Sequence, residues 1–380
     1  MSELRNTAQG LIVLQGNRME DLRDLTLQWL GRQPLHPLAR TLFLVQSNGI
    51  AQWLKTSLAE RGGEPGYGVC LGTDVALPAR FQWQAYRSVI EAVEGPGRVP
   101  TTSPYDKSRL RWRLMRLLPE ALDNPLFAPL ARYLRDDDEQ RKHYQLAERL
   151  ADLFDQYQVY RADWLNAWEA GDDILTLAGN RQLPVPEEQR WQPALWRMIG
   201  ADLGQEQIHS HRGAVHRRFM AAAKELTERP DTLPPRIVIF GISSLPQQTL
   251  EVLASLAGIS EVVLCLLNPC RFYWGEIIET QEVLRRYARQ QRRKGMPAEL
   301  HHSPEQLHLH AHPLLAAWGK QGRDYINLLD QHDERASYEA RFAAINGGRV
   351  DLFEPPPGDS LLQQLQQDIP ELRPLAETRE

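Results

Sequence analysis

Cysteine is scarce in this sequence of 380 residues, which contains only Cys70, Cys265 and Cys270. No CxxC pair is present, so the sequence indicates neither a disulfide framework nor a zinc site. Long apolar runs are also missing. The longest, Val262–Leu267, has six residues, far fewer than the ~20 of a membrane-spanning helix. The first residues lack the apolar segment of a secretory signal. Together these absences predict a reduced, cytoplasmic protein with no membrane segment.

Neither sign of charge dominates the chain. Its formal net charge is −5 at pH 7, with 24% charged and 42% apolar residues, which is near the average of soluble globular proteins. A general affinity for polyanions is therefore excluded, and any contact with DNA or RNA must come from local patches. At ~150 residues per domain, the length predicts two or three domains with a sizeable core.

Four short apolar runs predict buried strands. Each is partly β-branched and is bounded by polar, Gly or Pro residues, which is typical of parallel strands covered on both faces. The runs are Leu11–Leu14, Thr41–Val45, Arg236–Phe240 and Glu261–Leu267. A helical pattern follows each of the first three. This alternation predicts an α/β fold with a parallel, doubly wound sheet.

The long stretch between the second and third strands contains no strand-like run. Its clearest helix is predicted at Arg141–Tyr160, with an apolar stripe formed by Leu146, Leu150, Leu153, Phe154, Tyr157 and Tyr160. We predict a large, inserted, all-helical subdomain at 101–230 and an α/β core formed by 1–100 and 231–350. In 351–380 we predict a linker and a short helix, Leu361–Ile369, and we expect them to lead into further domains.

The turn after the first predicted strand lacks the residues of a phosphate-binding loop. A P-loop reads G-x-x-x-x-G-K-[ST], because backbone amides and the lysine hold phosphate while the hydroxyl holds Mg²⁺. Residues 13–20 contain one glycine, Gly16, and no lysine. The third strand is followed by Gly241–Ser244, without the carboxylate that would hold the metal. The layout is that of a nucleotide-driven motor without its two essential sites. The sequence therefore predicts no ATP hydrolysis and no cofactor or metal bound by this chain.

Two clusters of ionisable residues invite a metal-site interpretation. One is the acidic run Asp136–Glu139, although a Mg²⁺ site needs carboxylates that converge from separate elements. The other is a group of histidines that follows no known ligand spacing. Its members are His301, His302, His308, His310 and His312. A solvated loop or helix start is the favoured interpretation of both clusters.

Six longer strings closely resemble the RecC family, the gamma subunits of bacterial exodeoxyribonuclease V. They are Leu44–Leu54, Ala151–Tyr157, Val159–Leu165, Phe240–Pro246, Asn268–Gly275 and Pro313–Tyr325. The resemblance runs through essentially the whole chain, whereas full family members are much longer. It implies the N-terminal region of a subunit that looks like a superfamily 1 helicase without ATPase chemistry.

The resemblance also implies a function and partners. Such a subunit helps to split duplex DNA, channels the 3′-ended single strand and recognises the recombination hotspot Chi during double-strand break repair by homologous recombination. The implied partners are the RecB and RecD subunits, which use ATP and Mg²⁺. The implied ligands are single-stranded and forked DNA.

Residues that line the DNA channel in this family have counterparts throughout the chain. They are Gln46, Asn48, Gln52, Leu77, Trp83, Asp152, Leu153, Asp155, Gln156, Arg161 and Arg212. Gln46 and Asn48 directly follow the second predicted strand, where ligands of doubly wound sheets bind, and their amides suit base edges. The structural alternative is that Ser47 or Asn48 caps the next helix. The best-characterised family pattern has Thr in place of Asn48, which leaves open the DNA word that is read.

Two acids and an amide share one helix face, since Asp152, Asp155 and Gln156 are spaced i, i+3 and i+4. Acids repel phosphate but can accept hydrogen bonds from base amino groups; the alternative is a solvated face. Arg161 and Arg212 can pair with phosphate, stack on a base or bind guanine. Leu77 and Trp83 are candidates for apolar channel positions, with Trp83 able to stack on a base, or for core packing.

Two further segments leave an alternative function open. Arg285–Lys294 is a basic run, and 271–295 contains seven basic and three acidic residues. It suits DNA phosphates, an acidic partner surface or a solvated helix. The most distinctive string, Pro313–Tyr325, suggests core packing or a contact with a partner subunit, carried by Trp318, Gly319, Arg323 and Tyr325. The alternative function is therefore a protein-interaction scaffold that holds RecB and RecD, with DNA contact incidental.

Overall fold

A computed structural model describes residues 11–36, 38–60, 66–136, 140–177, 180–204, 207–275, 313–330, 332, 352–358 and 360–371. The chain divides into two compact units. The sheet unit comprises Met1–Phe81, Leu233–Leu245 and Thr249–Glu380, and the helical unit comprises Gln82–Thr232 and Pro246–Gln248. The bounds predicted for the inserted subdomain, 101–230, stay a prediction.

A five-stranded parallel sheet in the order β1-β7-β6-β2-β3 forms the centre of the sheet unit. All four strands expected from apolar runs are confirmed. Their observed bounds are β1 Leu11–Gly16, β2 Thr41–Val45, β6 Arg236–Phe240 and β7 Glu261–Leu267. The sequence pattern missed the fifth, β3 Thr73–Ala76, because this short edge strand is only partly buried and has no apolar run.

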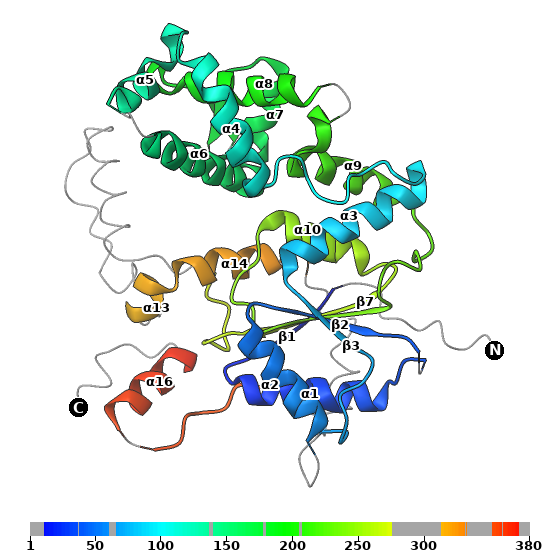
Figure 1. The fold of residues 1–380 in the computed structure, drawn as a ribbon. Coiled ribbons are helices and arrows are strands. Elements are labelled where there is room, and N and C mark those ends of the chain that lie inside the picture. The colour runs from blue at the N-terminus through cyan, green and yellow to red at the C-terminus, as the bar shows by residue number, and fades with distance from the viewer. Residues whose placement is uncertain are drawn as a thin grey trace. The chain divides into compact units, whose positions relative to one another are not determined.

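Helices cover both faces of the sheet, as a doubly wound fold requires. Helices α1 Met19–Arg32 and α2 Asn48–Ala59 lie on one side and α10 Gln247–Leu256 on the other (Figure 1). Alternate residues of the strands, such as Ile12, Phe43 and Val263, pack with the leucines of α1 and α2 in one core. The opposite positions are also buried. Burial on both faces explains why the strands read as continuous apolar runs.

The helical unit contains most of the remaining helices. Their bounds are α3 Pro78–Glu94, which begins in the sheet unit, α4 Lys107–Ala121, α5 Ala128–Leu134, α6 Arg141–Tyr160, α7 Ala162–Ala170, α8 Trp191–Leu203 and α9 Arg212–Glu225. Phe154, Trp168 and Trp196 are fully buried at the centre of a core to which α4, α6, α7 and α8 contribute. Many of the tryptophans of this chain are therefore structural.

The prediction that the insertion is all helical is wrong in one place. Strands β4 Ile174–Leu177 and β5 Arg181–Pro184 form a small antiparallel hairpin, with Leu175 opposite Leu183. All four residues of β5 are exposed, and β4 is only half-buried. The apolar residues of Ile174–Leu177 were a signal for β4, which packs partly on the core of the helical unit through Leu175. The exposed strand β5 has no apolar run to mark it.

The bounds predicted for the helix Arg141–Tyr160 are confirmed, but its buried face is shifted. Tyr160, expected on the apolar stripe, is 69% exposed, because it stands at the last turn of α6. Ala147, Ala151 and Gln158 are buried instead. The small alanines let α6 pack closely on its neighbours, and Gln158 is a buried polar residue that the stripe did not predict.

The C-terminal part of the sheet unit adds α13 Pro313–Trp318, α14 Lys320–Asp330 and α16 Leu361–Glu371. The last confirms the predicted terminal helix and extends it by two residues. All three cysteines are free, as expected, and Cys265 is fully buried with its thiol 3.2 Å from the Thr26 hydroxyl. Among the described helices, none has the length and apolarity needed to cross a bilayer.

Candidate nucleic-acid interface

In the sheet unit, four of the predicted residues lie at one edge of the sheet. Gln46 follows β2, Asn48 and Gln52 lie on the first turns of α2, and all three are exposed. Leu77 follows β3, the strand paired with β2, and is 52% exposed. The three amide side chains form no hydrogen bond with any other residue that the structure describes. They are therefore available to a ligand at the carboxyl ends of neighbouring strands.

Ser47 is the residue that caps α2. Its Oγ accepts a hydrogen bond from the backbone N–H of Ile50 at 3.4 Å. Asn48 is the first helical residue and gives no side-chain cap. The structural explanation of Asn48 as an N-cap is therefore wrong, and Ser47, the other residue considered, takes that role.

The turn after β1, where a P-loop would lie, is filled by a later segment of the chain. Leu352 forms a bridge with Gly16, and a Cβ added to Gly16 would lie 2.9 Å from the Leu352 Cβ. The Asn17 side-chain amide donates to the Glu354 carbonyl at 2.7 Å, and its oxygen accepts from the Glu354 N–H at 3.0 Å. The groups that would face a phosphate in a motor protein are thus engaged with residues 352–354.

In the helical unit, the predicted acids of α6 are paired with cations. Lys107 Nζ lies 2.7 Å from Asp152 Oδ1, and the Gln156 amide donates to Asp152 Oδ2 at 3.5 Å. The hydrogen bond from Lys107 lowers the pKa of the Asp152 carboxyl below its ordinary value. Asp152 therefore stays charged and bound to a cation, which reduces the repulsion that this face would exert on phosphate.

Arg212, the first residue of α9, lies between two acids. Its guanidinium is 3.3 Å from Asp155 and 3.6 Å from Asp106. Burial raises the pKa of the Asp155 carboxyl above its ordinary value, and the nearby Arg212 only partly offsets that effect. The Arg212 side chain is 27% exposed. The structure thus brings Asp155 and Arg212 together from distant parts of the sequence.

The raised pKa of Asp155 predicts how stability responds to pH. When a carboxyl group has a higher pKa in the folded chain than in the unfolded chain, its protonated form favours folding. This stabilising contribution is complete below the pKa of the unfolded chain and is lost as pH rises through the pKa of the folded chain. In the variant Asp155→Asn, the side chain at this position carries no charge at any pH. We therefore expect this variant to melt at a higher temperature than the parent at pH 7, with the difference shrinking toward pH 4.

Thermal unfolding over a pH series measures this difference, and Asp152→Asn is the matched control on the same helix. The pKa of Asp152 is lowered, so its charged form favours folding and its contribution is lost on acidification. Asp152→Asn is therefore expected to change stability at pH 7 in the opposite direction. A melting temperature for Asp155→Asn below that of the parent at pH 7 would show that the Arg212 ion pair outweighs the cost of burial.

Gln158 is a residue of this region that the sequence did not point out. It is fully buried. Its amide donates to the Tyr105 carbonyl at 3.1 Å and accepts from the Arg212 N–H at 3.2 Å. The first N–H groups of a helix have no partner within it, so Gln158 supplies one to α9 and ties Arg212 to α6. The sequence did contain a sign of this burial, because Gln158 lies one helical turn after Phe154 on the buried stripe of α6.

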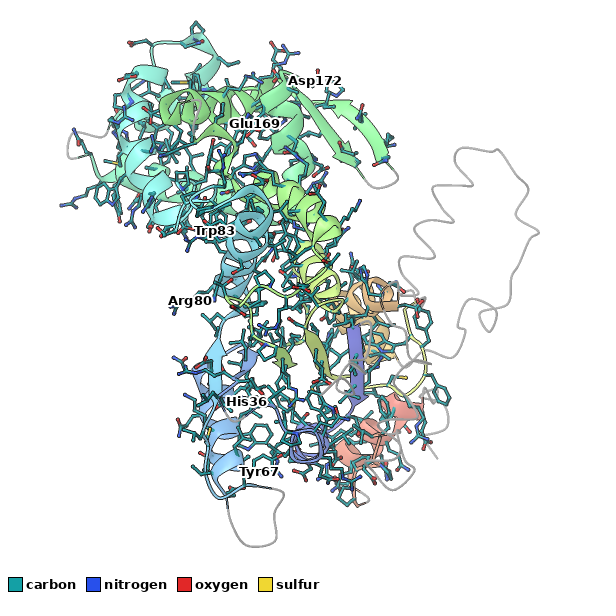
Figure 2. All side chains as sticks on the ribbon, turned by 90° about the vertical axis from the view of Figure 1, so that its right-hand side faces the viewer. His36, Tyr67, Arg80, Trp83, Glu169 and Asp172 are labelled. Atoms are coloured by element: carbon teal, nitrogen blue, oxygen red, sulfur yellow. The ribbon has the colours of Figure 1, made fainter. Side chains whose placement is uncertain are left out.

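The remaining predicted residues of the helical unit are engaged in internal contacts. Arg161 bonds Asp163 at 2.9 Å and the Thr176 carbonyl, and its guanidinium lies 3.9 Å from the ring centre of Trp164. Trp83 on α3, labelled in Figure 2, is half-buried and donates to the Pro100 carbonyl at 3.1 Å. Leu153 is half-buried on α6. For these residues the packing role is visible in the structure, and contact with DNA stays a prediction.

The Pro313–Tyr325 string divides between core and surface. Arg323 and Tyr325 are buried, and a Cβ on Gly319 would lie 2.8 Å from the Trp274 ring. These observations confirm core packing for those three positions. Trp318 is 82% exposed, so the core interpretation is wrong for it.

Three predicted features fall wholly or largely outside the described residues. They are the basic run Arg285–Lys294, the histidines His301, His302, His308, His310 and His312, and all of the acidic run Asp136–Glu139 except Asp136. Within the described part of the chain, no three His, Cys, Asp or Glu side chains form a group suited to hold a metal ion.

Comparison with known proteins gives a consistent result. A family model described as RecC, N-terminal domain, matches residues 11–372. The chain is 35% identical over 378 residues to the RecBCD enzyme subunit RecC of Escherichia coli strain K12, covering 95% of this chain and 31% of that protein. It is 33% identical over 390 residues to the same subunit of Haemophilus influenzae, covering 94% of this chain and 33% of that protein. The chain spans about a third of the length of these relatives. Since the family model matches nearly all of it, the chain belongs to the RecC family and corresponds to its N-terminal domain.

Proposed function

We propose that this chain is a non-catalytic, DNA-binding part of a RecBCD helicase–nuclease that acts in double-strand break repair by homologous recombination. In this proposal it channels the 3′-ended single strand and contributes to recognition of the Chi hotspot. RecB and RecD are the partner subunits, and they alone use ATP and Mg²⁺. Forked DNA is the substrate of the assembled enzyme, which acts in the cytoplasm.

The observation that carries the DNA-reading role is the mixed charge of the α6 face. Asp152 and Asp155 each lie beside a cation, Lys107 and Arg212 respectively. Neutralised acids repel phosphate less while their oxygens still accept hydrogen bonds from base amino groups. Gln156 on the same face is exposed and adds a donor and an acceptor. A face that only held phosphates would need cations without these acids.

Two observations support the non-catalytic part of the proposal. The turn after β1 is filled by residues 352–354 and has no lysine. The turn after β6 begins at Gly241, whose backbone has φ of +67°, and a Cβ there would lie 2.9 Å from side-chain atoms of both Ile50 and Met19. An aspartate or glutamate at this tight turn would be strained, and the residue present is glycine. The turn therefore begins without the carboxylate that would hold a metal ion in a motor protein.

The test is a fluorescence-anisotropy titration of a labelled single-stranded oligonucleotide with the whole chain at two salt concentrations. We expect Arg212→Ala to weaken binding about 5- to 100-fold, the effect of removing one arginine contact to a base or phosphate pair. Arg217→Ala is the control, because Arg217 is an exposed arginine on the same helix. It should change affinity little.

The competing scaffold function has one observation in its favour. Phe272, Tyr273 and Trp318 of the sheet unit are 52%, 54% and 82% exposed, and large exposed aromatic side chains suit a protein interface. If Arg212→Ala binds the oligonucleotide as tightly as the parent, the DNA-reading role fails. The scaffold role then becomes the better account of this chain.

A further inference from the structure

The outer face of α4 carries a cavity that no part of the proposed function uses. It is a shallow cavity, wide open to solvent, with a volume of about 520 Å³. The lining residues are Ser108, Arg109, Trp112, Arg113 and Arg116. They recur every three to four residues, so they share one side of the helix. The other side, with Leu110 and Leu114, is buried in the core of the helical unit.

Trp112 is exposed but held in position. It is 60% exposed, although a large aromatic side chain in a well-packed helix would normally be covered. The Arg111 guanidinium lies 5.4 Å from the centre of its ring and 5.3 Å from that of Tyr144. The rings of Trp112 and Tyr144 are 6.1 Å apart. Glu148 in turn pairs with Arg111 at 3.5 Å. The indole is therefore preorganised while much of its surface faces solvent.

Positive charge is in excess around the cavity. Arg113 and Arg116 both pair with the one carboxylate of Asp202. Arg109 is exposed and forms no ion pair with any residue that the structure describes. Burial, and to a smaller extent the neighbouring Arg116, lower the pKa of Arg113. The cavity thus presents three guanidinium groups against one shared acid.

We propose that this face of α4 is a binding site for single-stranded nucleic acid, in which an unpaired base stacks on Trp112 while Arg109 and Arg116 bind the adjacent phosphates. Single strands are bound by just this combination, an aromatic platform beside a cationic surface. Arginine suits phosphate because its planar donors can bind two oxygens at once. An acidic peptide would satisfy the arginines, but it would not need a fixed and exposed indole.

The site shares no residue with the candidate interface on α6 and α9. The proposed site on α4 does not depend on hotspot recognition by the α6 and α9 interface. One experiment can therefore test the two sites separately. The whole chain is titrated into a labelled oligothymidine, with Trp112→Ala, Arg109→Glu and Arg212→Ala in parallel. Arg190→Glu is the charge-matched control, since Arg190 is an exposed arginine of the same unit outside the cavity.

We expect Trp112→Ala to weaken oligothymidine binding roughly 5- to 100-fold, the effect of losing one stacked base. Trp112→Phe should recover part of the loss. Arg109→Glu should weaken binding and lower its dependence on salt, whereas Arg190→Glu should do neither. An oligonucleotide carrying 5-bromodeoxyuridine should cross-link on irradiation to the peptide that contains Trp112. Because Trp112 is largely exposed, its variants should melt close to the parent temperature.

Parent-like binding by both Trp112→Ala and Arg109→Glu would overturn this site. If Arg212→Ala were weakened in the same series, the α6 and α9 interface would stand without it. A labelled polyglutamate peptide is the second probe. Polyglutamate binding that Arg109→Glu abolishes, together with oligothymidine binding that Trp112→Ala leaves intact, would assign the cavity to an acidic protein partner and contradict the nucleic-acid site.

Discussion

Replacing Arg236 by methionine should lower the free energy of unfolding of the sheet unit by about 3–5 kcal/mol, the usual effect of removing one partner from a buried ion pair. Arg236 begins β6 and Glu261 begins the paired strand β7. Their side chains are 4% and 7% exposed, with Arg236 Nε 2.7 Å from Glu261 Oε2. Arg236 also donates to the Gln33 carbonyl at 2.8 Å and stacks over Trp29 at 4.5 Å. Its loss leaves the Glu261 charge buried without this ion pair.

Urea unfolding followed by circular dichroism measures the effect. Arg40→Met is a matched control, because Arg40 pairs with Asp74 at 3.1 Å but both side chains are at least half exposed. An exposed pair contributes about 0–1 kcal/mol. The double variant Arg236→Met/Glu261→Leu removes both charges and should recover most of the loss. A loss in Arg236→Met no larger than in Arg40→Met would mean that water reaches the Glu261 carboxylate.

The same pair shows which parts of the fold can be read from the sequence. Four strands of the sheet were predicted because both of their faces are covered, so that burial forces continuous apolar runs. Arg236 and Glu261 were placed at the right strand ends, but nothing in their spacing shows that they meet. Their contact depends on β6 and β7 lying side by side, which is decided by the sheet order. The edge strand β3 and the strand β5 escaped prediction because neither contains an apolar run; β3 is only partly buried and β5 is exposed.

The candidate interface divides in the same way. The helix period alone placed Asp152, Asp155 and Gln156 on the less buried face of α6. The cations beside the acids, Lys107 and Arg212, come from α4 and α9, and the sequence separation between helices carries no information about which side chains meet. These contacts decide whether the acids are free to repel phosphate. The chemistry of the face therefore becomes visible only in the folded chain.

For Gln158, the position on the helix predicts burial better than the polar character of the side chain does. Most glutamines are exposed to solvent. Yet Gln158 stands four residues after Phe154 and is buried with it. A buried amide requires hydrogen-bond partners, and Gln158 finds them in the Tyr105 carbonyl and the Arg212 N–H. A polar residue on an apolar stripe therefore marks a junction between elements.

The second large effect is expected for Gln158→Leu, which keeps the approximate size of the side chain and removes its amide. The Tyr105 carbonyl and the Arg212 N–H would each lose a partner, at roughly 1–3 kcal/mol for each buried group. We expect the free energy of unfolding of the helical unit to fall by about 2–4 kcal/mol. Gln156→Leu is the control, since Gln156 is exposed on the same helix. It should change stability by less than about 0.5 kcal/mol.

Gln158→Leu should also weaken single-strand binding, although Gln158 is fully buried and cannot touch DNA. The loss would act through Arg212, whose backbone N–H Gln158 holds at the start of α9. A double-mutant cycle with Arg212→Ala distinguishes this positioning role from general destabilisation, because residues that act through one contact give non-additive effects. We expect Gln158→Leu to weaken oligonucleotide binding in the parent and to change it little once Arg212 is alanine. Equal losses in both backgrounds would show that Gln158 supports the fold alone and does not position Arg212.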